Sequence, residues 1–288
     1  MTRGKDVTSV THFIKSLPGG SQPILVRADD GLLYVAKFTN NLQGQNLPFN
    51  EGVGTELYRA LHLKVPKWKP LLLTVEFLDK NPGCWLQTPG GSLRPASGLC
   101  FGSRFLGEDN KRLLEILPGN RFRRISNRGD FWLAWLIDIC AGHADNRQAI
   151  FLESKRGQDR AYFVDHGHMF CGPRGQDRPH FMASRHLDPR IYFGVSSRYL
   201  VAMQRAAMGL NLERLMDYMH ALPDEWMVAS AVDEFSRCLN RLSDARLLEN
   251  VVETMVSALR RGPAFEPADT NNERRPATER LRPGVQAA

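Results

Sequence analysis

Two aspartates in the middle of the chain have residue types and spacing that suit chemistry on phosphate groups. Asp145 lies in the run His-Ala-Asp-Asn-Arg-Gln-Ala-Ile-Phe, and Asp165 follows in the run Val-Asp-His-Gly. Each aspartate adjoins a short apolar stretch of the kind that forms a strand. One carboxylate could handle a substrate hydroxyl while the other holds a divalent metal on nucleotide phosphates. The pair predicts a site for phosphoryl transfer.

A lysine in the first third of the chain could bring a positive charge to the same site. In the predicted strand 32–38, side-chain alternation places Lys37 on one face with Leu33 and Val35. A lysine that shares a face with two apolar residues either lies at the sheet edge or points into a ligand pocket. In the pocket it would grip nucleotide phosphates and need a carboxylate partner.

The partner of Lys37 is expected from a helix that Asn50 would cap and that would run to residue 62. Glu51 lies in its first turn, where the helix dipole by itself favours an acidic residue. Glu56 lies on a later turn beside the apolar stripe, and by helix geometry alone it faces inward better. Spacing leaves the choice between the two glutamates open.

A glycine-rich loop precedes the predicted hairpin of strands 24–27 and 32–38, which the turn Asp-Asp-Gly joins. Backbone N–H groups of such a loop could cradle nucleotide phosphates. The predicted cofactor-binding residues of the loop are Gly19, Gly20, Ser21 and Gln22.

Taken in order along the chain, these motifs resemble the HipA-like kinase family. The resemblance rests on Gly-Gly-Ser-Gln-Pro, Val-Ala-Lys-Phe, Asn-Glu and the two aspartate runs, and it extends over residues 17–222. It implies an α+β, bilobed, protein-kinase-like fold with a β-rich N-lobe and a helical C-lobe. It also implies ATP and Mg²⁺ as ligands, and transfer of the γ-phosphate to a serine or threonine of a protein substrate. An antitoxin-like regulator is a further partner that the resemblance admits.

The resemblance also implies a role for each matching residue. Lys37 would contact the ATP phosphates, and Glu51 rather than Glu56 would pair with it. Asp145 would be the catalytic base and Asp165 the metal ligand. Family members with a serine in the glycine loop can phosphorylate it themselves, so self-phosphorylation is expected at the serine of this loop.

The sequence departs from the kinase pattern five residues after the catalytic aspartate. The pattern has a metal-binding asparagine there, but this chain has Ile150, which cannot coordinate a metal. We expect Gln148, ahead of Asn146, to supply an amide oxygen instead. By this resemblance we expect a short form, without the leading subdomain of the toxin-type members. A nucleotide-binding pseudokinase with a regulatory or partner-binding role is therefore the alternative hypothesis.

Histidines near the aspartates support a third hypothesis, a metal-dependent phosphohydrolase with a transition metal. No fixed-spacing motif such as His-Glu-x-x-His accompanies them. We expect His143 to brace its loop and His168 to be partly exposed, and we expect Asp138 in the predicted helix 130–140 to anchor the loop backbone. The four histidines are His143, His166, His168 and His186.

Composition places the chain among ordinary globular proteins, with 288 residues, 42% hydrophobic and 24% charged content, and a net charge of +7. Its five cysteines contain no Cys-x-x-Cys spacing, which argues against a disulfide framework or a structural zinc site. The start of the chain has no signal-peptide pattern, and no apolar run is long enough to span a bilayer. We expect a cytoplasmic protein with no membrane partner, and nothing points to nucleic acid.

The predicted organisation is an N-lobe over 1–103, a helical C-lobe over 104–262 and a disordered tail over 263–288. Further strands are predicted at 71–77, 84–88, 98–101, 149–152 and 161–164. Helices are predicted at 130–140, 197–208, 211–221 and 231–260.

Overall fold

The computed structural model describes residues 7–107, 112–118, 121–153, 157–177, 181–182, 184–194 and 196–260. The chain divides into two compact units, Met1–Val252 and Glu253–Ala288. All predicted site residues belong to the first unit. The predicted tail over 263–288 lies outside the described residues.

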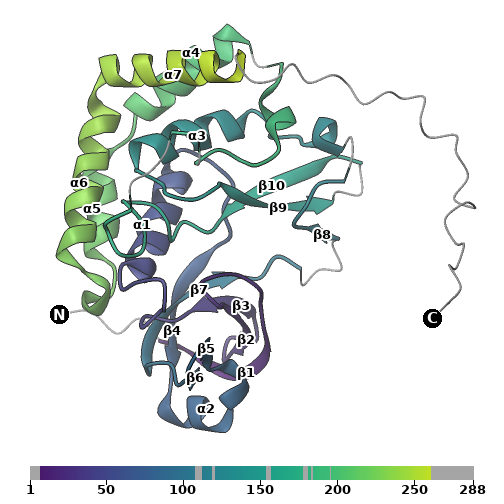
Figure 1. The fold of residues 1–288 in the computed structure, drawn as a ribbon, viewed down its shortest axis with the longest axis vertical. Helices are drawn as coiled ribbons and strands as arrows, with labels where there is room; N and C mark the ends of the chain where they lie inside the picture. Colours follow the sequence, from purple (N-terminus) through teal and green to yellow (C-terminus); the bar gives the residue numbers. More distant parts are fainter. Residues whose placement is uncertain are drawn as a thin grey trace, which may run out of the picture. The chain divides into compact units, whose positions relative to one another are not determined.

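The first third of the chain closes into a β-barrel with the strand order β1-β2-β3-β7-β4, in purple and blue in Figure 1. The β2–β3 hairpin forms as predicted, with Val26 opposite Tyr34. A strand before it, β1, was not predicted, because register shifts after Val10 and Phe13 obscure its alternation. The barrel strands are β1 (Thr8–Ser16), β2 (Ile24–Ala28), β3 (Leu33–Lys37), β4 (Trp68–Leu73) and β7 (Gly98–Arg104).

Helix α1 (Leu47–Ala60) follows β3 and is buried from its first residue through Tyr58. The prediction that Asn50 caps this helix is wrong. The helix begins three residues earlier, with a proline in its first turn, where the missing N–H costs no helical hydrogen bond. The buried amide of Asn50 instead donates a hydrogen bond to the carbonyl of Gly167 at 2.9 Å.

The strand predicted over 71–77 is wrong in its second half. The chain leaves β4 at Leu73, and the Thr74 hydroxyl accepts the N–H of Phe77 at 3.1 Å to cap helix α2 (Val75–Lys80). The strand predicted over 84–88 forms only as β5 (Leu86–Thr88), after the 3₁₀ turn η1 (Pro82–Cys84). It pairs with β6 (Gly91–Leu93) in a separate hairpin.

Helix α3 (Asp130–Cys140) and two strands carry the loops of the central aspartates. The helix has the predicted bounds and is almost wholly buried. Strands β9 (Gln148–Glu153) and β10 (Asp159–Val164) form where strands were predicted and pair antiparallel, with β8 (Leu113–Leu114) along the other edge of β9. Because Gln148 pairs with Val164, the loop entering β9 and the loop leaving β10 lie at the same end of the hairpin.

Helices follow after residue 196. Helix α4 (Ser197–Met208) and helix α5 (Leu212–His220) match the predictions closely. The single helix predicted over 231–260 is wrong, because the extended backbone of Asp244 separates α6 (Ala229–Ser243) from α7 (Ala245–Arg260). The carboxylate of Asp244 accepts the N–H of Leu247 at 3.0 Å and starts the second helix. Short 3₁₀ turns are η2 (Arg121–Arg124), η3 (Pro189–Tyr192) and η4 (Asp224–Trp226).

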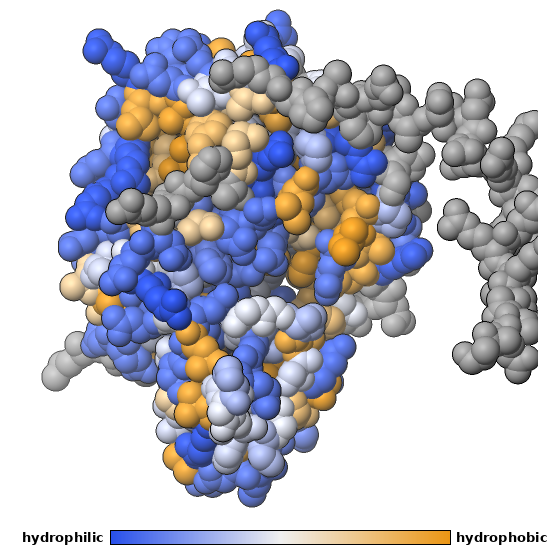
Figure 2. Space-filling model, in the orientation of Figure 1, coloured by the Kyte–Doolittle hydropathy of each residue, from blue (hydrophilic) through white to orange (hydrophobic). Residues whose placement is uncertain are grey.

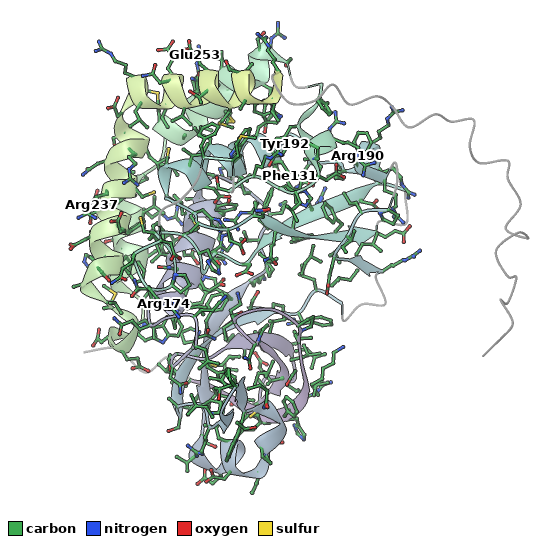
Figure 3. All side chains as sticks on the ribbon, in the orientation of Figure 1. Phe131, Arg174, Arg190, Tyr192, Arg237 and Glu253 are labelled. Carbon is green, nitrogen blue, oxygen red and sulfur yellow. The ribbon has the colours of Figure 1, made fainter. Side chains whose placement is uncertain are left out.

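Aromatic rings build the core beside α3. Tyr192 contacts Trp132 and Trp135, with ring centroids 5.8 and 5.3 Å apart. Phe131 contacts Phe163 of β10 at 4.9 Å, and Figure 3 labels Phe131 and Tyr192 in this region. The helix that precedes Asp145 is therefore fixed by large buried side chains on several sides.

On the face shown in Figure 2, hydrophilic residues dominate and hydrophobic residues gather in separate patches. The most exposed large apolar side chains are those of Ile116 and Leu187. The cysteines are all unpaired, and each except Cys171 is buried. Among the described residues, no helix has the length and apolar character needed to cross a membrane.

Candidate active site

A cavity of about 730 Å³ is lined by the glycine loop and by strands β3 and β7 on one side. The loops around Asp145 and Asp165 line the other side. Lys37, Glu51 and Gln148 also line it, so residues far apart in sequence meet in one place.

Lys37 forms the centre of a buried ion cluster in this cavity. Its Nζ donates to Oε1 of Glu51 and, at 2.9 Å, to Oδ1 of Asp165. Burial alone would lower the pKa of Lys37, but the charges of Asp165 and Glu51 outweigh this effect and raise it. The side chain therefore stays an ammonium at neutral pH.

Glu51, not Glu56, is the residue that pairs with Lys37, which answers the question that spacing left open. The carboxylate of Glu56 instead accepts hydrogen bonds from Arg59 and from the Trp68 indole, both at 2.8 Å. Helical-wheel reasoning favoured Glu56 because it took one face of α1 as inward. The structure buries α1 on every side through Tyr58, so the apolar stripe does not mark the face toward Lys37.

The backbone after Asp165 is held by two neighbouring residues of α1. The carboxylate of Glu51 accepts the N–H groups of His166 and Gly167 at 3.2 and 3.0 Å. The Nδ2 of Asn50 donates to the carbonyls of Gly167 at 2.9 Å and Met169 at 2.8 Å. Sequence reasoning saw only a helix cap in Asn50 and missed this contact.

Asp165 follows β10 in a left-handed backbone conformation, with φ 61°. Few residues other than glycine adopt this region, although aspartate does so more often than most. Burial would raise the pKa of Asp165, but the Lys37 ammonium beside it lowers the pKa far below the usual range. Its carboxylate is thus an anion that remains partly open to the cavity.

Asp145 lies in the loop between α3 and β9, and its Oδ1 accepts the N–H of Asn146 at 2.7 Å. His143 braces this loop, since its Nδ1 lies 2.6 Å from the carbonyl oxygen of Asp145. Burial, reinforced by the charge of Arg147, lowers the pKa of His143 to about 4. The ring is therefore neutral at physiological pH. Lys37 donates to Glu51 and Asp165, and Asp145 lines the same cavity from a different loop.

The glycine loop lines the cavity through Gly19, Gly20 and Ser21. The carbonyl of Ser21 accepts a hydrogen bond of 2.7 Å from Asn41, which ties the loop to the segment before α1. Gln22, also predicted to bind the cofactor, lies outside the cavity lining. Its side chain bonds the backbone of Gln87 in β5 instead, at 2.8 and 2.7 Å.

Gln148 and Ile150 lie on the same face of β9 but at different distances from the Asp165 turn. Gln148 is exposed at the first position of β9, opposite Val164 and thus next to Asp165. Ile150 lies two residues farther along the same face and adds an apolar side chain to the cavity. The fifth position after Asp145 is therefore inside the strand and not in the loop.

The oxygen donors around the cavity suit a hard divalent cation. Carboxylates of Asp145 and Asp165 and the amide of Gln148 all line it. Mg²⁺ prefers such oxygen donors and usually takes one or two carboxylates, with phosphates and water completing its octahedron. Within the described part of the chain, no group of three or more His, Cys, Asp or Glu side chains is arranged to hold a metal ion. A shared protein–nucleotide site fits these residues better than a closed protein cage.

The four histidines that motivated the hydrolase hypothesis have other surroundings. The ring of His166 packs against Tyr58 at 4.6 Å, and His186 packs against Phe131 at 5.2 Å. His168 Nε2 lies 3.3 Å from the amide of Gln43. His143, which braces its own loop, lies near His168, with ring centroids 6.4 Å apart, whereas His166 and His186 pack against other aromatic rings.

Comparisons with solved structures identify the architecture. No protein-family model and no curated protein matches the sequence. The chain is similar to the Golgi casein kinase, at 13% identity and TM-score 0.54 over 87% of this chain and 74% of that chain. The same kinase with Mn/ADP bound matches at 13% identity and TM-score 0.51, over 87% and 74%. The Helicobacter pylori proinflammatory kinase CtkA matches at 11% identity and TM-score 0.52, over 86% and 98%. The chain has a bilobed, protein-kinase-like fold.

In this kinase-like fold, the β-barrel is the N-lobe, and α3, the β8–β10 sheet and the helices after it belong to the C-lobe. The predicted α+β, bilobed architecture is thereby confirmed. The C-lobe contains the two predicted strands, β9 and β10, and a short strand that was not predicted, β8, and residues of all three line the cavity.

The buried neutral histidines predict a loss of stability in mild acid. Burial lowers the pKa of both His143 and His186 to about 4, whereas an unfolded histidine titrates near 6.5. Between these values the unfolded chain binds more protons, so the free energy of unfolding falls as pH decreases from 6.5 to 4.5. Each histidine contributes at most about 1.4 kcal/mol per pH unit.

Urea titrations at a series of pH values would measure this loss. The variant His186→Gln should flatten the dependence, because its side chain does not titrate. Identical slopes for the variant and the wild type would contradict the prediction for this ring.

Proposed function

We propose that this chain is a HipA-like, ATP- and Mg²⁺-dependent kinase that transfers the γ-phosphate to a serine or threonine of a protein. The observation that carries the proposal is the position of Lys37 between Glu51 and Asp165, in the same cavity as Asp145. A cation for phosphates, a carboxylate for metal and a separate carboxylate for a hydroxyl are the parts that phosphoryl transfer requires.

Each residue has a part in the proposed reaction. Asp145 accepts the proton of the attacking hydroxyl as its oxygen bonds to the γ-phosphorus and the bond from that phosphorus to the β,γ-bridging oxygen breaks, so that ADP leaves. Lys37, oriented by Glu51, binds nucleotide phosphate oxygens. Asp165 and Gln148 would hold Mg²⁺, which neutralises charge on the phosphates. Asp165 lines the cavity from a left-handed backbone position directly after β10.

The apolar part of the cavity suits the nucleotide base. Val35, Phe101, Phe105, Ile150 and Phe163 line it together with the polar residues named above. Bases are commonly held between apolar side chains, with a few polar groups that fix their orientation. On this proposal Ile150 supports the base and has no part in metal binding.

A pseudokinase remains the second candidate because of the same Ile150. If Gln148 does not bind metal, the site retains one metal carboxylate and would hold nucleotide without transferring phosphate. The partners proposed with either function are a protein substrate or target and an antitoxin-like regulator.

Mass spectrometry of the purified protein after incubation with ATP and Mg²⁺ tests transfer directly. We expect phosphate on the wild-type protein, with Ser21 of the glycine loop as the expected site, and none on Asp145→Ala. Nucleotide binding without any phosphate transfer to the protein or to an added protein substrate would favour the pseudokinase. Because Ser21 is only 6% exposed, its modification requires the loop to leave the position seen here.

A further inference from the structure

Arg147 lies two positions after Asp145, yet its guanidinium is turned into the protein interior. Its Nε and Nη2 donate to the two carboxylate oxygens of Asp138, at 2.7 and 2.6 Å, and both side chains are 0% exposed. The pair joins the loop before β9 to the middle of α3. The expectation that Asp138 anchors the loop backbone is thus replaced by a side-chain ion pair.

The remaining nitrogen of the guanidinium reaches the loop after β10. Nη1 of Arg147 donates to the carbonyls of Val164 at 3.0 Å and Asp165 at 3.2 Å. It also lies 3.3 Å from Nδ1 of His166. One side chain from the Asp145 loop therefore contacts three successive residues at the Asp165 turn.

Tyr58 of α1 contacts both members of this ion pair. The guanidinium of Arg147 lies over the ring of Tyr58, with its carbon 4.9 Å from the ring centroid. The Tyr58 hydroxyl donates to Oδ1 of Asp138 at 2.7 Å. The network thus connects α1, α3 and both acidic loops. The side chains of Tyr58, Asp138 and Arg147 are all buried.

Stability alone is a weak explanation for such a buried pair. The cost of removing both charges from water often cancels their attraction, so apolar replacements of similar size can be neutral or stabilising. What apolar residues cannot do is hold the carbonyls on either side of the left-handed Asp165 backbone. Lysine cannot do so either, because only a planar guanidinium presents fixed donors in several directions at once.

We propose that Arg147 is a positioning residue that holds Asp165 in its metal-binding orientation and ties it to the Asp145 loop. This inference rests on the proposed function, in which Asp165 binds the metal of a metal–nucleotide complex. It assigns to Arg147 an effect on metal affinity that a purely structural ion pair would not have.

The variants are chosen so that the fold can survive. Arg147→Met combined with Asp138→Leu replaces the pair by apolar side chains, and the Tyr58 hydroxyl keeps an acceptor in the Ala134 carbonyl at 3.3 Å. Arg147→Lys keeps the positive charge but loses the planar guanidinium and its several fixed donors.

A matched control exists in the same lobe. Arg121 binds Asp159 through the same two nitrogens at 3.0 and 2.7 Å, and neither residue lines the cavity. The control is Arg121→Met combined with Asp159→Leu.

The measurement is the affinity for Mn²⁺ in the presence of a non-hydrolysable ATP analogue, followed by the paramagnetic resonance signal of free Mn²⁺. Thermal unfolding of each variant is measured alongside. We expect the Arg147 variants to lose about 10- to 100-fold in Mn²⁺ affinity, the usual effect of removing a partner that orients a metal ligand. Affinity for the analogue without metal should be unchanged, and the Arg121 control should bind Mn²⁺ like the wild type.

A folded Arg147 variant with wild-type Mn²⁺ affinity would overturn the inference while leaving the proposed function intact. Unfolding of both Arg147 variants would also overturn it, since the pair would then be required for folding itself. A wild-type protein that binds analogue but no Mn²⁺ would instead refute the proposed metal site, and the inference with it.

Discussion

Asparagine in place of Asp145 is expected to reduce phosphate transfer by about 10²- to 10⁴-fold, the usual contribution of a general base. The substitution keeps the size of the side chain and one acceptor oxygen for the N–H of Asn146. The substitution leaves the ion pairs of Lys37 with Glu51 and Asp165 in place, so nucleotide binding should persist. The loss should therefore appear in the rate of transfer and not in affinity.

Single-turnover transfer from ATP, together with the affinity for a non-hydrolysable analogue, would separate the two effects. Asp79→Asn is a suitable control, because Asp79 forms an exposed pair with Arg94 outside the cavity. Wild-type transfer rates in Asp145→Asn would rule out this carboxylate as the base.

The second large effect is expected from Lys37→Met. This change leaves the carboxylate of Glu51, whose side chain is 3% exposed, without its cation. Removing one partner of a buried pair typically lowers the free energy of unfolding by about 3–5 kcal/mol. Transfer should be lost as well, because the ammonium that donates to both Glu51 and Asp165 is removed from the cavity.

A double variant and a surface control make this prediction specific. Adding Glu51→Gln to Lys37→Met should recover part of the stability but no activity, because the uncompensated charge is removed while the amide oxygen can still accept the N–H of Gly167. Lys69→Met breaks a pair with Asp30 whose side chains are 39% and 26% exposed, and should cost less than about 1 kcal/mol. Urea denaturation would measure all three. A similar cost for Lys37→Met and Lys69→Met would contradict the buried cluster.

Many of the strands and helices that carry the site residues could be predicted from sequence. Strong apolar periodicity and the Asp-Gly turn located the β2–β3 hairpin, and α3 is apolar over nearly its whole length. Elements with less regular sequence patterns were not predicted. The shifts in β1 hide its alternation, and the break at Asp244 has no proline or glycine to mark it.

The polar network beneath the site was harder to predict than the cavity residues. Lys37 and Asp165 have recognisable neighbours in sequence, but Arg147 and Asn50 are polar residues that the fold buries against distant segments. A signal did exist for the first of these. Asp138 is a charge inside an otherwise apolar helix, and a buried carboxylate requires a cation from elsewhere. Spacing alone does not say which arginine supplies it.

Calorimetric titration of a non-hydrolysable ATP analogue, with and without Mg²⁺, tests the central claim most directly when wild type and Asp165→Asn are compared. The kinase-like site predicts that Mg²⁺ strengthens binding to the wild type much more than to the variant, which has lost the metal carboxylate and keeps only Gln148. Failure of the wild type to bind the analogue, or an equal effect of Mg²⁺ on both proteins, would contradict the account.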